Sequence, residues 1–458
     1  MYALASDPAM TGKWSQLVTV SVCAITLVPA TSAGQGERQD RHRVPADFMS
    51  FQGAQWLERD ERVAEEQPER VLDAMGLEAG DVVADVGCGS GYYARRMARR
   101  VMPGGTVYCE DIQPEMLDIM RQLAAEDGTT GINPVLGTAT DPKLPEGALD
   151  WIIIADVYHE MSNPVPMLAG LRRALSPTGR VALLEYRVED GTGDQIKADH
   201  TMSVRQVVVE WHAAGFELVA LHDFLPGQHL FFFRAARGDP GALAVHDLFD
   251  AIDGGLVEAE ATAAGADRVA VRIRRTGEDP VVVTSPVATY FAAGRGARDM
   301  VARRDGWIVL DEGGWHDWSL RALARQRDQA GPPHGTGLEI RPPTTVPKLE
   351  ALFYAIQVGT YTVADSPTLY PPRTQAVEEA AVWITDGDAD YVTVAPDVEG
   401  PRVPAPYAVA FALVFCDEAG IDVTRLRVWN DREEVFGVLR DQGLRAWYQI
   451  KTAGRVIR

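Results

Sequence analysis

One segment constrains the fold of this 458-residue chain more than any other: the glycine-rich stretch Asp85-Val86-Gly87-Cys88-Gly89-Ser90-Gly91. It follows a short apolar run and opens a pattern of helical spacing. Glycine tolerates the left-handed backbone of a sharp turn and lets a ligand approach the main chain closely. A strand that turns through such glycines into a helix is typical of ligand sites in α/β sheets. The stretch therefore predicts an α/β fold with a ligand at this turn.

Apolar runs alternate with helical patterns from residue 44 to about residue 236. Seven runs are expected as strands: Val82–Val86, Thr106–Asp111, Ile132–Gly137, Leu149–Ala155, Arg180–Tyr186, Phe216–His222 and His229–Arg234. Such alternation predicts a parallel sheet with helices on both faces. The turn pair Pro226-Gly227 predicts a final hairpin, which makes the last strand antiparallel. We expect a seven-stranded, doubly wound (Rossmann-like) sheet in residues 44–236.

The second half of the chain has a different pattern and contains no chemical motif that we can name. Alternating or β-rich runs occur first, and helical patterns follow after a proline-rich loop. We expect a β-rich domain in residues 240–345 and a mixed, mainly helical region in residues 346–458.

The N-terminus has the features of a secretory signal peptide. Lys13 precedes an apolar run from Leu17 to Val28, and small residues follow up to Ala33. This order is typical of exported proteins. We predict a signal peptide at residues 1–33, a linker at 34–43, and a periplasmic or extracellular protein with no stable membrane span after removal of the leader. A non-functional leader would leave the protein in the cytoplasm.

The charge balance narrows the class of partner. The chain has 65 acidic and 44 basic residues, a net charge of −21. Such a surface repels phosphate backbones, so we expect no nucleic-acid partner. A small-molecule substrate is expected instead, and the sequence does not indicate an oligomeric state.

Three stretches together carry a family resemblance. The glycine-rich turn resembles motif I of class I S-adenosylmethionine (SAM)-dependent methyltransferases. The stretch from Val107 to Leu117 is similar to the second strand and following helix of that family, and Leu175-Ser176-Pro177-Thr178-Gly179-Arg180 is similar to its turn before the fifth strand. The resemblance covers residues 44–236 and implies SAM as cofactor and methyl transfer as activity.

The resemblance also implies positions for the cofactor-binding residues. Asp85 and the turn residues Gly87, Cys88, Gly89 and Gly91 are expected beside the methionine part of SAM. Asp111 is expected to hold the ribose, with Glu110 as the alternative, next to Ile112. Thr138 is expected beside the adenine, and Asp156 near the transferred methyl. A helix before the sheet often caps the pocket in this family, which makes Trp56 and Arg59 candidate cap residues.

Several polar residues should meet at the carboxyl edge of the sheet, where ligands of such folds bind. His159 is the first candidate for a base that accepts the acceptor's proton, and His200 the second. Glu185 and Glu160 are candidates to orient a histidine or bind substrate, and Tyr158 and His229 are further substrate candidates. His159, His200 and Glu185 have no recognisable ligand spacing, so no metal site is predicted.

Two other functions compete with methyl transfer to a small molecule. SAM is made in the cytosol, so an exported chain could be a binding or structural protein that keeps the fold without catalysis. A nicotinamide-dependent oxidoreductase is the other alternative, but the spacing G-x-G-x-G differs from the dinucleotide fingerprint G-x-G-x-x-G.

Overall fold

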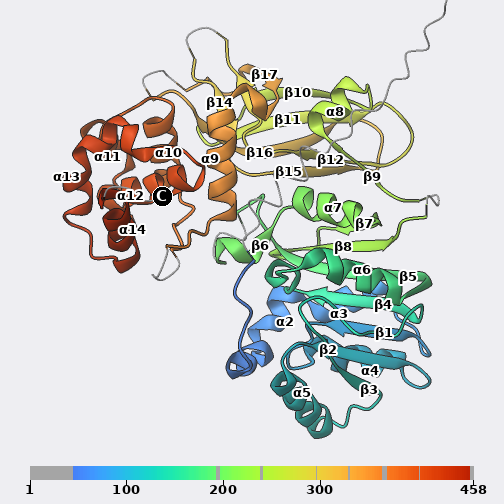
Figure 1. Cartoon of the computed structure of the whole chain (residues 1–458). Coiled ribbons are helices and arrows are strands. Elements are labelled where there is room, and N and C mark those ends of the chain that lie inside the picture. Colours follow the sequence, from blue (N-terminus) through green and yellow to red (C-terminus); the bar gives the residue numbers. More distant parts are fainter. Residues whose placement is uncertain are drawn as a thin grey trace, which may run out of the picture.

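The computed structural model describes residues 45–191, 196–237, 241–294, 297–327, 331–363, 369–401 and 403–453. The predicted signal peptide and linker lie outside these ranges. Figure 1 shows an α/β sheet domain, a β-barrel and a group of helices. Within the described ranges, no helix combines the length and the apolar character needed to cross a membrane.

The first domain is built on one mixed sheet with the strand order β3-β2-β1-β4-β5-β8-β7. Its strands are β1 (Val82–Val86), β2 (Thr106–Asp111), β3 (Ile132–Leu136), β4 (Leu149–Ala155), β5 (Leu175–Arg187), β7 (Phe216–His222) and β8 (Gln228–Ala235). Strand β8 runs antiparallel to both β5 and β7. The predicted Rossmann-like sheet is therefore confirmed. A short eighth strand that was not predicted, β6 (Thr201–Met202), pairs with the end of β5.

Apolar side chains on both faces of the sheet explain why helices cover it twice. Along β4, Ile152 and Ile154 belong to one core and Ile153 to the other, because successive side chains of a strand point to opposite faces. The Ile153 face packs against α3 (Pro68–Met75), α4 (Tyr92–Val101) and α5 (Pro114–Glu126). The opposite face packs against α6 (Pro164–Ala174) and α7 (Val204–Ala213).

The second half begins with strands that form two sheets. A closed barrel has the order β10-β11-β16-β14-β13-β17, and a three-stranded sheet has the order β15-β12-β9. The barrel strands are β10 (Val257–Ala263), β11 (Arg268–Arg275), β13 (Tyr290–Ala292), β14 (Met300–Ala302), β16 (His316–Ala324) and β17 (Gly337–Arg341). The smaller sheet consists of β9 (Ala244–Asp247), β12 (Val281–Ser285) and β15 (Gly306–Leu310).

The helices that follow share a core with the barrel. They are α9 (Pro347–Val358), α10 (Gln375–Thr385), α11 (Tyr391–Val398), α12 (Ala405–Glu418), α13 (Arg432–Phe436) and α14 (Gln442–Thr452). Tyr290, Val301 and Leu323 of the barrel belong to the same apolar cluster as these helices. The boundary expected at residue 345 therefore separates two kinds of secondary structure but not two separate cores.

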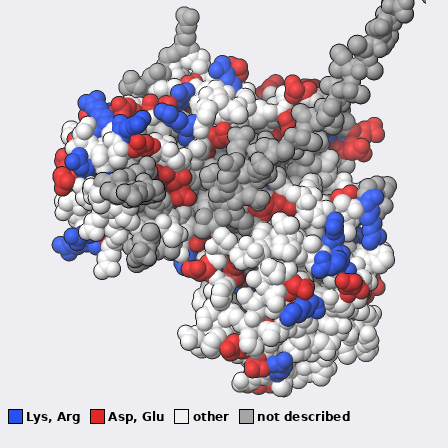
Figure 2. Space-filling model, viewed as in Figure 1, with Lys and Arg blue, Asp and Glu red and all other residues white. Residues whose placement is uncertain are grey.

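Charged side chains are dispersed over the visible surface. On the face shown in Figure 2, lysines and arginines lie among aspartates and glutamates. Many pair directly, for example Arg100 with Glu69 and Asp73 at 2.5 and 2.6 Å.

Candidate active site

A cavity of about 690 Å³ opens at the carboxyl ends of β1, β2, β4 and β5. This is the edge at which open α/β sheets bind their ligands, and the volume suits a cofactor-sized molecule. Six acidic residues line it: Asp47, Glu66, Glu110, Asp111, Asp156 and Glu160. Apart from His159 and His200, two basic residues line it, Arg62 and Lys197. The cavity therefore favours a ligand that carries positive charge.

The glycine-rich turn forms one wall of the cavity because its backbone is left-handed. Gly87 and Gly89 have φ of +67° and +54°. A Cβ on Gly87 would lie 2.5 Å from Cγ1 of Val157. Gly87, Cys88 and Gly89 line the cavity, whereas Asp85 and Gly91 do not. Asp85 instead accepts a hydrogen bond from the amide of Ala94 at 2.8 Å, so it connects the turn to α4.

Two carboxylates at the end of β2 brace the same turn and face the cavity. Asp111 accepts hydrogen bonds from the amides of Gly89 at 2.9 Å and Gln113 at 2.8 Å. Glu110 accepts one from the amide of Gly87 at 3.3 Å. Desolvation by burial raises the pKa of Glu110 to about 8 and raises that of Asp111 as well. A cationic or hydrogen-bonding ligand would offset this cost of burial.

Ile112, expected beside the ribose, and Asp156, expected near the methyl group, line the cavity, whereas Thr138, expected beside the adenine, does not. The Thr138 hydroxyl closes its own turn with Asp141, and the neighbouring Ala139 lines the cavity instead. Asp156 is partly buried with φ of +54°, and one oxygen accepts from the side-chain amide of Gln228 at 2.6 Å. Its other oxygen is buried and has no hydrogen-bond partner among the described residues, so it can accept from a ligand donor.

The segment before the sheet supplies a cap that differs in detail from the prediction. Trp56, in the 3₁₀ helix η1 (Phe51–Glu58), lines the cavity. Arg59 does not, since its guanidinium stacks 3.5 Å from the Trp56 ring centroid and pairs with Glu65. Arg62 and Glu66 of α2 (Glu61–Glu66) were not predicted, yet they line the cavity as a buried ion pair at 2.6 Å. Their i, i+4 spacing was the one available signal.

His159 lies in the turn η2 (Tyr158–Glu160) and lines the cavity, and one of its ring nitrogens contacts a buried carboxylate. Its Nδ1 lies 2.6 Å from Oε2 of Glu185, whose other oxygen accepts from the His159 amide at 3.2 Å. Burial opposes the charged ring, but the charge and hydrogen bond of Glu185 outweigh it and raise the pKa of His159 to about 9. Glu185 itself is fully buried and does not line the cavity, so it acts as an orienting group.

His200 reaches the same wall from a different part of the chain. It ends the turn η4 (Ala198–His200), and its Nδ1 lies 2.7 Å from Oδ1 of Asp199. The rings of His159 and His200 are 5.0 Å apart between centroids.

Two predicted substrate residues lie in the core instead. Tyr158 is fully buried and donates its hydroxyl to Glu210 at 2.7 Å. His229 is buried with Nε2 3.0 Å from Glu189, against the ring of Trp307. Successive side chains point in different directions along both the strand β8 and the 3₁₀ turn η2, so a position at the sheet edge could not reveal which of them face the cavity.

Comparison with known proteins identifies the domain that carries this cavity. Residues 83–179 match the family model described as a methyltransferase domain.

Residues 83–179 are a methyltransferase domain.

The match confirms the predicted resemblance to class I methyltransferases and, with it, SAM as the cofactor expected of the domain.

The methyltransferase domain also resembles individual proteins over a limited length. A ubiquinone/menaquinone biosynthesis C-methyltransferase from Edwardsiella ictaluri is 33% identical over 116 residues, which are 25% of this chain and 46% of that protein. The enzyme of the same name from Pasteurella multocida is 29% identical, with 25% and 43% covered. The chain therefore spans less than half the length of these relatives. Among solved structures, a SAM-dependent methyltransferase from Aquifex aeolicus is 24% identical with a TM-score of 0.38, covering 41% of this chain and 98% of that one.

The second half of the chain contacts the part of the first domain that carries His200. Ser203 donates to Asp305 at 2.6 Å, and Arg205 contacts both carboxylate oxygens of Asp247 at 3.0 and 3.1 Å. Arg373 donates to the hydroxyl of Thr201 at 3.2 Å. Gly359, after α9, lies so close to Ala198 that an added Cβ would be 2.0 Å from the alanine methyl. The C-terminal half thus fixes one wall of the site.

A disulfide joins the glycine-rich turn to the next strand. Cys88, one of the residues expected to bind the cofactor, lines the cavity, and its sulfur is bonded to Cys109 of β2. No disulfide was predicted from the sequence. The available signal was the position of the two cysteines, which are 21 residues apart. Cys88 lies just after β1, and Cys109 lies in the neighbouring strand β2.

Removal of this disulfide should lower the stability of the methyltransferase domain. In a Cys88→Ser/Cys109→Ser variant we expect a loss of about 3 kcal/mol in unfolding free energy, since the crosslink restricts the unfolded chain. Denaturation monitored with and without a reductant provides the check. The reductant should destabilise the wild type and leave the variant unchanged; equal stability of oxidised and reduced wild type would contradict the expectation.

Proposed function

We propose that this protein transfers the methyl group of SAM to a small-molecule acceptor bound in the cavity. The observation that carries the proposal is the cavity itself, which joins a left-handed glycine turn, two braced carboxylates and a surplus of acidic residues. SAM carries a sulfonium and an ammonium group, so this electrostatic environment favours it. The family match to a methyltransferase domain supports the same reading.

The cofactor would lie along the carboxyl ends of β1, β2 and β4. Gly87, Cys88 and Gly89 line the part of the cavity where its methionine part would lie. Asp111 still has free lone pairs after its two backbone hydrogen bonds, so it can accept from the ribose hydroxyls. The unpartnered oxygen of Asp156 can accept from a cationic or hydroxyl donor.

Methyl transfer is a displacement at carbon with an activated leaving group, so the protein mainly supplies proximity and alignment. Asp156, His159 and His200 line the wall at which the sulfonium methyl would be held. Because the pKa of His159 is about 9, its ring carries a proton at neutral pH in the ligand-free protein. It therefore binds or orients an acceptor oxygen more readily than it removes a proton.

Titration of SAM into the purified chain tests this function. We expect saturable binding of one molecule per chain, and transfer of a labelled methyl group from SAM to a component of a small-molecule extract. A folded protein that binds neither SAM nor its demethylated product S-adenosylhomocysteine would overturn the proposal.

One observation favours export, and with it the alternative of a non-catalytic protein. Disulfides persist in oxidising compartments and are rare in the cytosol, so the Cys88–Cys109 bond supports a periplasmic or extracellular location. We propose such a location for the mature chain. Fractionation of cells, with sequencing of the mature N-terminus, tests it. Cofactor binding by the exported form would favour an enzyme, and its absence a binding protein.

A further inference from the structure

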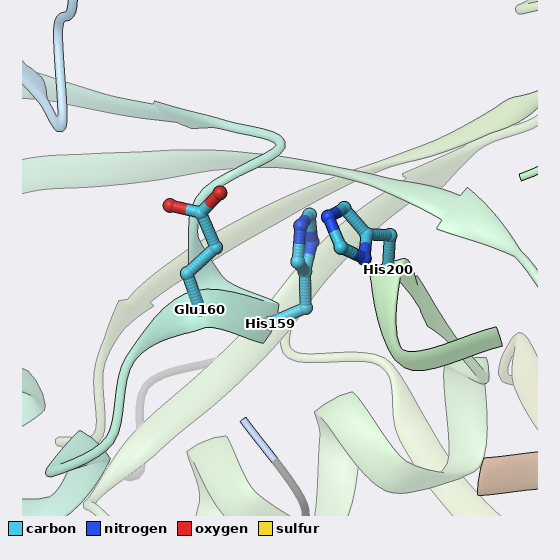
Figure 3. Close-up of side chains that lie close together, drawn as sticks. All are labelled: His159, Glu160 and His200. Carbon is cyan, nitrogen blue, oxygen red and sulfur yellow. The ribbon is translucent and has the colours of Figure 1, made fainter. Parts of the chain in front are cut away.

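Two imidazoles and a carboxylate converge on one wall of the cavity. His159 and Glu160 come from η2 and His200 from η4, and Figure 3 shows the two rings next to each other with the Glu160 carboxylate beside them. One ligand atom from each residue lies within 4.8 Å of the other two. All three residues line the cavity.

Each histidine is held by a carboxylate on the side away from this meeting point. Nδ1 of His159 contacts Glu185 at 2.6 Å, and Nδ1 of His200 contacts Asp199 at 2.7 Å. Both carboxylates are buried. Such a contact fixes the tautomer with the proton on Nδ1 and leaves Nε2 as the available nitrogen. Metal-binding histidines almost always have this second partner.

We propose that His159, His200 and Glu160 bind a divalent transition-metal ion at the wall of the methyl-transfer cavity. Imidazole nitrogens together with one carboxylate suit ions such as Zn²⁺ or Fe²⁺, whereas Mg²⁺ and Ca²⁺ prefer oxygen ligands. Atoms bound to such an ion at about 2.1 Å lie about 3.4 Å apart in a tetrahedron, so ligand atoms that now lie within 4.8 Å of one another need to approach by up to about 1.4 Å. Three protein ligands leave at least one position open toward the cavity.

The surroundings favour a cation at this place. Six acidic residues line the cavity against two basic ones apart from the histidines. Lys197 is the basic residue that is closer to His200 in the sequence, and its ammonium lies 5.0 Å from the ring centroid of Tyr370.

A metal ion at this site would restrict the methyl acceptor to molecules that offer an oxygen ligand. This inference about the acceptor rests on the proposed methyltransferase function. A hydroxyl bound to a divalent ion has a lowered pKa and releases its proton to water. The oxygen then forms a bond to the methyl carbon. The sulfur–carbon bond breaks with its electron pair on sulfur, which yields S-adenosylhomocysteine and the methyl ether.

Calorimetric titration of Zn²⁺ into the full chain, purified without a polyhistidine tag and stripped with chelator, tests the site. We expect one ion per wild-type chain, and an affinity at least about 100-fold lower in His200→Gln, His159→Gln and Glu160→Gln. Asp199→Asn should weaken binding about 10–100-fold through His200. His212→Gln, which changes an exposed histidine outside the cavity, is the matched control and should bind like the wild type.

Each variant is also titrated with S-adenosylhomocysteine, which reports on the fold and on the cofactor site separately. Absence of Zn²⁺ binding by the wild type, or binding that persists in both His200→Gln and Glu160→Gln, would overturn the metal site. Zn²⁺ binding without S-adenosylhomocysteine binding would leave the metal site standing and refute the methyltransferase function. Co²⁺ in place of Zn²⁺ should give a visible spectrum that His200→Gln loses.

Discussion

Replacement of Asp111 by alanine should reduce the affinity for SAM at least about 100-fold, or about 3 kcal/mol. Two losses contribute. The carboxylate can no longer accept from the ribose, and charge-assisted hydrogen bonds of this kind are worth about 1.5–3 kcal/mol each. The glycine turn also loses the 2.9 Å brace on the Gly89 amide, so the wall of the cavity is less well preorganised. Calorimetry of SAM or S-adenosylhomocysteine binding measures the change.

The matched control is Asp118→Ala on α5. Asp118 is an exposed aspartate seven positions further along, and it pairs only with Arg121 among the contacts described. We expect wild-type affinity in this variant. Unchanged affinity in Asp111→Ala would place the ribose elsewhere, with Glu110→Gln as the variant to examine next.

Replacement of Glu378 by alanine should cause the largest loss of stability in the chain. Glu378, on α10, is fully buried and contacts two arginines that directly follow strand β14 of the barrel, Arg303 at 2.5 Å and Arg304 at 2.6 Å. Its removal would leave two buried guanidinium groups without their shared carboxylate. Breaking a buried ion pair in this way costs about 3–5 kcal/mol. The midpoint of chemical denaturation of the C-terminal half, followed by tryptophan fluorescence, measures the change.

Glu379→Ala is the matched control, since this neighbour on the same helix is only partly buried and accepts from Gln375 at 2.7 Å. Its effect should stay below about 1 kcal/mol. If Glu378→Ala changed the midpoint as little as this control, the ion pair would not stabilise the contact between barrel and helices.

The ion pairs of Glu378 also predict that the stability of the folded protein depends on pH. Burial opposes the charge of Glu378, but the two arginines outweigh it and lower the pKa to about 2, from 4.5 for an ordinary glutamate. A lowered folded-state pKa stabilises the protein above the unfolded pKa, and this stabilisation disappears as the pH falls from about 4.5 toward 2. The difference in stability between wild type and Glu378→Gln should therefore shrink over that range.

The sheet could be predicted in detail because its signals are local. Parallel strands buried on both faces are continuous apolar runs, so Leu149–Ala155 was recognisable without a partner. The glycines at 87 and 89 were recognisable because few other residues adopt a left-handed turn. The barrel was less predictable. Its closure depends on pairings such as β10 with β17, which lie more than 70 residues apart.

The amino-acid sequence by itself determined the α/β sheet, the glycine turn and the acidic pair that follows β2, since each depends on neighbours within a few positions. Only the tertiary structure decided which polar side chains face the cavity. Tyr158 and His159 are adjacent, yet one is in the core and the other at the site. The convergence of His159, Glu160 and His200 likewise requires two turns 40 residues apart to meet, and contacts with the C-terminal half hold the second turn in place. Such contacts arise from packing over the whole chain, so no local pattern in the sequence encodes them.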